Sequence, residues 1–503
     1  MLQFLSEAFI ARLDATFILL LFSVAGLVFT LWCVVYNLFW HPLAGYPGPL
    51  LARVTRLYKA YVELLGRGCL VHKLEELHAV YGDVVRIGPN ELHYAAPSVY
   101  FELYSSLRRW DKDELFYRAF LTDNASFCFT SYKQANERKG AMNWLFSKNG
   151  VKNVHSRIES RVEELCRSFK RQNDCEIDLY YAFRCMSLDV ITDICFGMPI
   201  DPLNSSESKS ALVSGMDVAQ ETFAGLKHSS IYRTMSKYFP QALVTLFDPR
   251  IAGITELQDT NNINKDIQKS CEPSYRTVIH HFLQPDCNGT VLTEKAIRDE
   301  CQVLLFAGTD TTGMTLMRGF FHILKSKKIY AALKEELEHA WPEVGQRLSL
   351  SELERLPYLT AVIKESLRMN QGVVSPLPRI VHSPGAIIGD RYVPANAVVG
   401  MSTHFVLQNK TIFEGPSEFR PERWLGDKAK DLDRWLVSFS RGPRSCLGIN
   451  LAWAELYTCF AHVFRKFEIE IEASSPENLV WIDRFMPVYQ GPHVKATMRA
   501  TAV

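Results

Sequence analysis

The chain has 503 residues, of which 47% are hydrophobic, and its formal charge at neutral pH is +1. That length allows a large buried core, and the balanced charge excludes a general attraction for nucleic acid. Its twelve cysteines form no Cys-x-x-Cys pair, which argues against a zinc cluster or a thioredoxin-like site. Their spacing does not resemble a disulfide framework, so a reducing compartment fits better.

The first feature along the chain is an uncharged stretch over residues 15–40. As a helix it would span about 39 Å, which is enough to cross a hydrocarbon core of about 30 Å. A cleaved signal peptide would have a shorter apolar region and a small-residue cleavage site, which the sequence FWHP (39–42) does not resemble. We therefore expect residues 15–40 to form a transmembrane anchor.

Basic residues set the expected orientation of this anchor. Three of them follow the span, namely Arg53, Arg56 and Lys59. Arg12 alone precedes it, so the positive-inside rule places residues 1–14 in a lumen and residues 41–503 in the cytosol. The prolines of HPLAGYPGP (41–49) fix the backbone and remove donors, which predicts a stiff neck instead of a continued helix.

Beyond the neck we find no repeat and no long linker, so residues 41–503 are expected to form one domain. The segment DVVRIGPNELHY (83–94) predicts a β-hairpin around its Gly-Pro-Asn turn. Helical periodicity recurs in six longer segments: 155–170, 211–226, 293–325, 327–341, 357–369 and 449–467. Short strand-like pieces appear near 379–399 and 466–472. The expected fold class is mainly α with minor β sheet.

The segment FSRGPRSCLGINLAWAEL (439–456) contains the pattern F-x-x-G-x-R-x-C-x-G, formed by Phe439, Gly442, Arg444, Cys446 and Gly448. A thiolate that binds haem iron needs a tight loop that presents its sulfur to the metal. The two glycines allow the turn and a close backbone approach, and the arginine offers a fixed cation to a haem propionate. The apolar helix that follows brings its positive end towards the sulfur, which stabilises a thiolate.

With this motif the chain resembles the cytochrome P450 haem-thiolate monooxygenases, from the anchor to the last hundred residues. The resemblance implies a cytochrome P450 fold over 41–503, behind the transmembrane helix. It also implies haem b with Cys446 as the axial ligand of its iron, and dioxygen as co-substrate. The neck and the cysteine segment are similar to fungal members that act in secondary metabolism, as in the trichodiene oxygenase branch.

Two further motifs match this family. KESLR (364–368) supplies Glu365 and Arg368, and FRPERW (419–424) supplies Arg423. An i,i+3 charge pair alone means little, because such pairs occur on most exposed helices. The resemblance implies that the three side chains form a buried network that holds the haem-side core, with a structural role.

Besides this charged network, a further motif is LLFAGTDTTG (304–313), in a long helix that Thr293 could cap. On its own this stretch is typical of a polar core in which the threonines bond back to carbonyls. The resemblance instead implies an oxygen-binding groove over the haem, where Ala307 and Gly308 leave room for oxygen and substrate. Asp310 and Thr311 would then be the catalytic residues of a proton relay.

Two more cations are candidate propionate partners by the same resemblance. Arg379 follows the Glu-x-x-Arg helix, in SPLPRIV, and Arg138 lies in the segment YKQANERKGAMNWLFSK. The aromatic residue or histidine that the family carries before this arginine is replaced by Ala135, so one propionate contact is in question.

The resemblance places the substrate pocket along five segments: 108–125, 219–228, 302–311, 372–377 and 484–488. Its expected lining residues are Phe223, Phe306, Val373, Leu377 and Met486, which suit an apolar ligand that few polar contacts hold. Each of these could equally be a core residue. The segment FPQALVTLF (239–247) leaves two alternatives, a helix that dips into the bilayer to admit lipophilic substrate or a buried helix.

Together these features predict a single-pass monooxygenase of the endoplasmic reticulum membrane with a cytosolic catalytic domain. It would insert one atom of dioxygen into a terpenoid, polyketide or alkaloid, by hydroxylation, epoxidation or further oxidation. Electrons would come from a separate NADPH-dependent reductase. One alternative is a haem-thiolate isomerase or dehydratase that does not activate dioxygen, against which the presence of Asp310 and Thr311 argues. Another is a non-catalytic haem-binding sensor or carrier.

Overall fold

The structure is a computed structural model that describes residues 2–66, 69–172, 174–201, 203, 211–239, 275–285, 291–427 and 429–501, with side chains from residue 17 onward. The segment 239–247, for which the sequence leaves two alternatives, lies outside these ranges except for its first residue.

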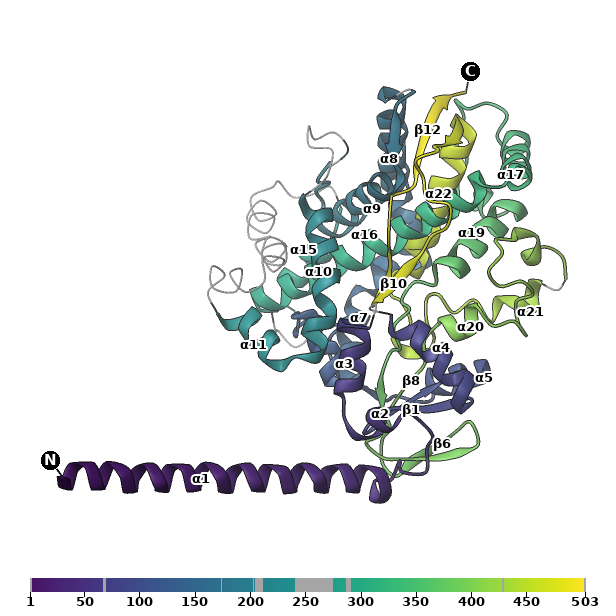
Figure 1. The fold of residues 1–503 in the computed structure, drawn as a ribbon. Helices are drawn as coiled ribbons and strands as arrows, with labels where there is room; N and C mark the ends of the chain where they lie inside the picture. The colour runs from purple at the N-terminus through teal and green to yellow at the C-terminus, as the bar shows by residue number, and fades with distance from the viewer. Residues whose placement is uncertain are drawn as a thin grey trace.

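Helices make up most of the described chain (Figure 1). They are α1 (Leu2–Val35), α2 (Leu50–Val54), α3 (Leu57–Leu64), α4 (Leu70–Tyr81), α5 (Pro97–Leu103), α6 (Glu114–Tyr117), α7 (Tyr132–Phe146), α8 (Lys148–Arg171), α9 (Leu179–Phe196), α10 (Ala211–His228), α11 (Ser230–Tyr238), α15 (Val278–Leu283), α16 (Glu294–Leu324), α17 (Lys327–Ala340), α18 (Leu350–Leu353), α19 (Pro357–Asn370), α20 (His404–Leu407), α21 (Ala429–Asp433) and α22 (Ile449–Lys466). Short π or 3₁₀ turns are η1 (Tyr36–Trp40), η2 (Arg118–Phe120), η3 (Pro421–Trp424) and η4 (Gly442–Arg444).

The strands are short and form four small sheets. They are β1 (Val84–Gly88), β2 (Glu91–Tyr94), β3 (Asp111–Lys112), β4 (Glu176–Asp178), β5 (Arg379–Ile380), β6 (Gly385–Ile388), β7 (Arg391–Pro394), β8 (Val398–Gly400), β9 (Phe467–Ile471), β10 (Trp481–Arg484), β11 (Met486–Tyr489) and β12 (Lys495–Ala500). The predicted class, mainly α with minor β sheet, is confirmed.

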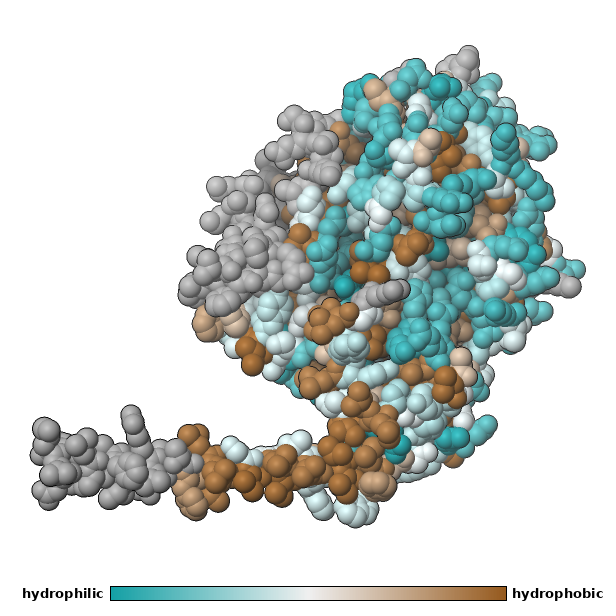
Figure 2. Space-filling model, viewed as in Figure 1, coloured by the Kyte–Doolittle hydropathy of each residue, from teal (hydrophilic) through white to brown (hydrophobic). Residues whose placement is uncertain are grey.

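The N-terminal helix α1 extends away from the body, and η1 continues it to Trp40 (Figure 1). Its stretch Phe17–Trp40 has a mean hydropathy of 2.6 and none of the window is buried. Figure 2 shows the described part of this helix as a continuous apolar surface. The helix ends where His41 turns to an extended backbone, as the following prolines predict. Length and composition therefore suit a membrane span.

The largest sheet lies beside the anchor, with α2, α4 and α5 near it (Figure 1). Its strand order is β1-β2-β8-β5-β3, and β1 pairs with β2 in the predicted hairpin, with Val84 opposite Tyr94. A second sheet, β4-β12-β9, lies at the far end of the body. The helices between these sheets hold the main core, so the cysteine segment at the start of α22 is surrounded by helices.

Helix α16 runs through the body and packs most closely on α9. Thr293 caps its first turn, as predicted, by accepting a hydrogen bond from the N–H of Ala296. A Cβ atom on Gly308 would lie 2.7 Å from the side chain of Ile191 on α9. The helix crossing therefore requires a glycine at this position, in addition to the room that Gly308 was expected to leave for oxygen and substrate.

A fully buried ion network joins α19 to the segment before α21. The guanidinium of Arg368 donates to Glu365 at 2.8 Å, and Arg423 Nε donates to the same carboxylate at 3.1 Å. The indole N–H of Trp424 and the backbone N–H of Arg420 complete it. Burial alone would raise the pKa of Glu365, but these donors and charges lower it. The predicted structural triad therefore forms, with every carboxylate oxygen bonded.

We expect Glu365→Gln to lower the free energy of unfolding by about 3–5 kcal/mol, because it leaves buried arginines without a counter-charge. Urea titration of the purified full-length protein, followed by circular dichroism, measures the change. The control is Glu414→Gln, which breaks an exposed pair with Arg420 and should cost less than about 1 kcal/mol. Similar losses for the two variants would contradict a central role for this network.

Candidate functional site

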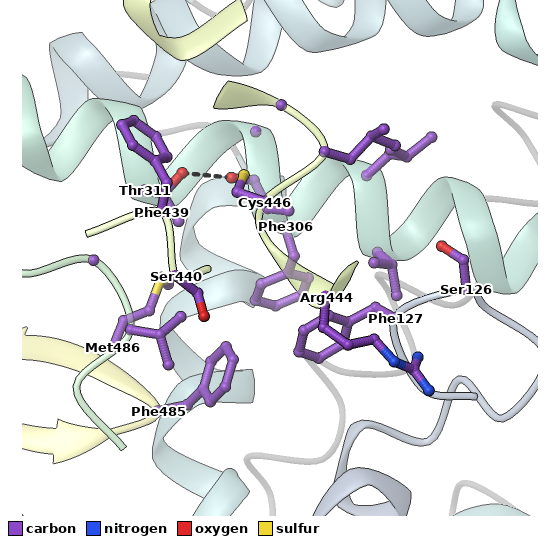
Figure 3. A pocket seen from close by; sticks show the side chains of 18 of the residues that line it. Ser126, Phe127, Phe306, Thr311, Phe439, Ser440, Arg444, Cys446, Phe485 and Met486 are labelled. Carbon is purple, nitrogen blue, oxygen red and sulfur yellow. Dashed lines mark hydrogen bonds between the residues drawn. The ribbon is translucent and has the colours of Figure 1, made fainter. Parts of the chain in front are cut away.

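One large cavity lies between α16, the start of α22 and the cysteine loop 439–448 (Figure 3). It contains about 2370 Å³ of space that no protein atom fills, open mouths included. All five residues that the sequence placed around the substrate line it: Phe223, Phe306, Val373, Leu377 and Met486. Cys446, Thr311 and Ala307 line the same space.

The cysteine loop depends on one glycine for its shape. Gly442 adopts a φ of +70°, and a Cβ atom on it would lie 2.3 Å from the carbonyl oxygen of Tyr104. The N–H of Cys446 then donates to the carbonyl of Phe439 at 2.9 Å, which closes the loop. Gly448 differs from the expectation, because its φ of −84° is ordinary. A Cβ there would lie 4.0 Å from the Cys446 sulfur, so this glycine keeps the space beside the sulfur clear.

The sulfur of Cys446 is exposed to the cavity just before α22 begins. Burial within the protein raises the pKa of its thiol, while a hydrogen bond from the Gly448 N–H and the charge of Lys139 lower it. Among the described residues, no group of three or more His, Cys, Asp or Glu could hold a metal ion. A porphyrin iron fits a site with this single sulfur, because it carries its other ligands with it.

Four cations gather at this cavity without an ion pair to any carboxylate in the described part of the chain: Lys112, Lys139, Arg379 and Arg444. Arg444 donates to the carbonyls of residues 129–130 at 3.1 and 2.9 Å, and its Nε has no hydrogen-bond partner. Burial lowers the pKa of Arg444 to about 10 and that of Lys112 well below its usual range. This uncompensated charge fits a ligand with two carboxylates, which is what the haem propionates provide.

Lys112 is one of the two members of this group, with Lys139, that the sequence analysis missed. It is buried and donates to the carbonyl of Phe127, with its ammonium 3.9 Å from the ring centroid of Tyr117. A lysine in the stretch WDKDEL belongs to no motif. Only the fold identifies this lysine as a candidate, because it buries the side chain beside two arginines.

Arg379 lies in the wall behind the cavity surface. It is buried and donates to the hydroxyl of Tyr117 and to the carbonyl of Pro378, each at 3.0 Å. It is not among the lining residues, and its contact with a propionate stays a prediction. Its charge nevertheless adds to that of Lys112 and Arg444.

The structure places Arg138 outside the cavity lining, so its expected contact with a propionate stays a prediction. Its guanidinium lies 3.7 Å from Glu300 and outside the cavity lining. Lys139 lines the cavity instead and donates to the carbonyl of Ser445 at 2.6 Å. Successive helical residues point about 100° apart, so only one of the two can face the site. Ala135 also lines the cavity, and its position four residues before Lys139 marks the helix face that could have identified this lysine.

The two residues of the expected proton relay point in different directions. Thr311 faces the cavity and its hydroxyl donates to the carbonyl of Ala307 at 2.7 Å (Figure 3). Asp310 is fully buried and turned away, accepting from Arg184 at 2.7 Å and from Gln220. Burial raises the pKa of this carboxyl, and the guanidinium lowers it. Asp310 therefore points away from the cavity that Thr311 faces, and their relay stays a prediction.

The partner of Asp310 connects three helices. Arg184 on α9 is completely buried and bonds both Asp310 on α16 and Asp217 on α10, the latter at 2.6 Å. The hydroxyl of Tyr180 donates to the same Asp217 at 2.7 Å. These residues share no sequence motif, which is why the network could not be predicted. It attaches α10, a wall of the cavity, to the helix that carries Thr311.

We expect Lys139→Met to speed the loss of haem about tenfold, because one charge-assisted contact is removed. Transfer of haem from the purified protein to an excess of apomyoglobin measures the rate. Arg138→Met is the matched control, since its guanidinium faces Glu300, and its rate should change much less. Faster haem loss from Arg138→Met than from Lys139→Met would instead support the role that the sequence assigned to Arg138.

Comparison with known proteins supports the same conclusion. The family model "Cytochrome P450" matches residues 58–481. The chain is 30% identical to cytochrome P450 monooxygenase flvC of Aspergillus flavus, over 93% of this chain and 94% of that protein. It is 33% identical to tryptophan 6-hydroxylase fscE of Fusarium equiseti (88% and 90% covered) and 31% identical to N-acetyltryptophan 6-hydroxylase ivoC of Emericella nidulans (91% and 92%). With the sulfur loop, the cation group and the buried Glu365 network in place, this chain belongs to the cytochrome P450 monooxygenases.

Proposed function

We propose that this protein inserts one oxygen atom from dioxygen into an apolar secondary metabolite, by hydroxylation, epoxidation or further oxidation. One observation carries the proposal: a cysteine sulfur, a group of uncompensated cations and a threonine hydroxyl share a single apolar cavity. Relatives named as monooxygenases and hydroxylases favour oxygen insertion over an isomerase, a dehydratase or a sensor.

When bound, haem supplies an iron atom that can activate dioxygen with electrons from a donor. The residues around it have separate tasks. Cys446 would supply the sulfur that holds the iron, and the Gly448 N–H and the positive end of α22 would stabilise its negative charge. The Thr311 hydroxyl holds a proton at the cavity surface, where it can be passed to a reacting oxygen. Asp310 can supply that proton only after its carboxylate leaves Arg184.

The substrate side of the cavity favours an apolar molecule. The five lining residues that the sequence predicted are hydrophobic, and they come from α10, α16, the segment after α19 and β11. Such walls hold a ligand mainly by excluding water, with a few polar contacts to orient it. A terpenoid, polyketide or alkaloid scaffold meets this requirement.

The exposed apolar helix Phe17–Trp40 supports a single-pass anchor in the endoplasmic reticulum membrane. The basic residues after it support a cytosolic catalytic domain over 41–503 and a lumenal segment over 1–14. Electrons are then supplied by a separate NADPH-dependent reductase on the same membrane. Co-expression with a fungal reductase and candidate scaffolds, under dioxygen of the heavy isotope, tests the whole proposal by the mass of the product.

We expect Cys446→Ser to abolish the absorption band of the thiolate-ligated, reduced carbon monoxide complex, because a serine hydroxyl ionises poorly and is a harder ligand. The spectrum of the purified, reduced protein under carbon monoxide is the measurement. Cys175→Ser changes an exposed cysteine far from the motif and should leave the band intact. A normal band from Cys446→Ser would remove the ligand assignment.

Thr311→Ala should divert electrons from product to hydrogen peroxide, because the cavity loses the hydroxyl that holds the proton. The ratio of hydrogen peroxide formed to NADPH consumed should rise severalfold. It is measured with reductase and a scaffold that the native enzyme oxidises. Thr309→Ala is the control on the same helix, since Thr309 is buried outside the cavity lining. Full coupling in Thr311→Ala would exclude the proposed role of this hydroxyl.

A further inference from the structure

Four phenylalanines from separate segments meet at one end of the cavity. We call them the aromatic box: Phe120 of η2, Phe127 of the following loop, Phe223 of α10 and Phe485 between β10 and β11. The ring centroid of Phe120 lies 5.2 Å from that of Phe127 and 4.9 Å from those of Phe223 and Phe485. All four side chains line the cavity, and Figure 3 shows Phe127 and Phe485 beside it.

The box differs from one group of stacked rings in the core. That group is Phe320, Phe460 and Phe464, whose planes lie within 30° of each other and which are completely buried. In the box, the plane of Phe120 lies at 88° to that of Phe127 and 78° to that of Phe485. These three box rings are only partly buried, so they offer ring faces and edges to the cavity. Such surfaces suit a flat aromatic ring.

Phe485 is also held in a strained backbone conformation. Its φ is +80°, which a bulky residue rarely adopts and which glycine adopts without cost. Its N–H donates to the Asp483 carboxylate at 3.0 Å, and its carbonyl accepts from the N–H groups of Val374 and Ser375 at 3.0 and 3.2 Å. The turn could be built more easily with glycine. A phenylalanine in this strained position therefore indicates that its ring has a function in the cavity.

We propose that the substrate of this enzyme presents a flat aromatic ring to the aromatic box, where it stacks on Phe485 and meets the edges of Phe120 and Phe127. This inference rests on the proposed function, since it names the class of substrate that the same cavity takes. Each aromatic contact of this kind adds, beyond simple area burial, up to about tenfold in affinity over a saturated ring of the same skeleton. The box residues are thus specificity-determining and take no part in the chemistry.

The test uses the haem-loaded, full-length protein in detergent and two probes of one carbon skeleton, naphthalene and decalin. The shift of the haem absorption band on titration gives each dissociation constant. The ratio of the two constants is compared between proteins, so that partition of the probes into detergent cancels. We expect Phe485→Leu to weaken naphthalene binding about tenfold relative to decalin. Phe101→Leu, which changes a partly buried phenylalanine of α5 outside the cavity, should keep the native ratio.

Phe485→Gly separates the ring from the strain. It should lose the preference for naphthalene, because glycine accepts the turn without strain but carries no ring. Phe120→Leu is an independent second variant with the same expected loss of preference. A native ratio in these variants, or no band shift with naphthalene, overturns the inference. The carbon monoxide spectrum of the same samples shows which proposal failed. If the thiolate band is missing, both the proposed function and the aromatic preference are contradicted. If the band is present, only the aromatic preference is contradicted.

Discussion

The presentation of one sulfur atom is the constraint on which the rest of this structure depends. Cys446 offers a single sulfur to the cavity, and no group of three or more His, Cys, Asp or Glu assists it among the described residues, so the group that it holds needs further contacts. The structure supplies these as four cations without counter-charges and as apolar walls. Gly442 makes the arrangement possible, because no other residue could adopt its φ of +70° so close to the Tyr104 carbonyl.

Two buried ion networks lie beside this site, and they differ in how many separate helices they connect. The Glu365 network is complete and local, because every partner lies on α19 or in the segment that leads to η3 and Trp424. It holds the core beside the cysteine loop. The Arg184 network instead joins α9, α10 and α16, and its outer member Asp217 is partly exposed. Since α10 also carries Phe223 of the aromatic box, this network connects the substrate wall with the helix of Thr311.

Much of the fold and part of the site could be predicted, because both depend on short-range patterns. The hairpin at 83–94, the six periodic helices and the Glu-x-x-Arg pair each lie within one segment, where spacing alone determines which side chains meet. The motif that pointed to Arg138 could not show that Lys139 lines the cavity, because that requires the rotation of α7 to within one residue. The orientation of Asp310 could not be predicted either, since it depends on Arg184, more than a hundred residues earlier in the chain.

By itself, the sequence determined that the chain carries an apolar helix, a mainly helical body and a cysteine loop suited to hold haem iron. These follow from periodicity, from hydropathy and from the need for glycine and arginine near a thiolate, all of which act over a few residues. Only the tertiary structure decided which cations face the cavity, where Asp310 points, and that Phe120, Phe127 and Phe485 meet. Those outcomes depend on how distant helices and turns pack, because burial, and not spacing, selects the partner of each side chain.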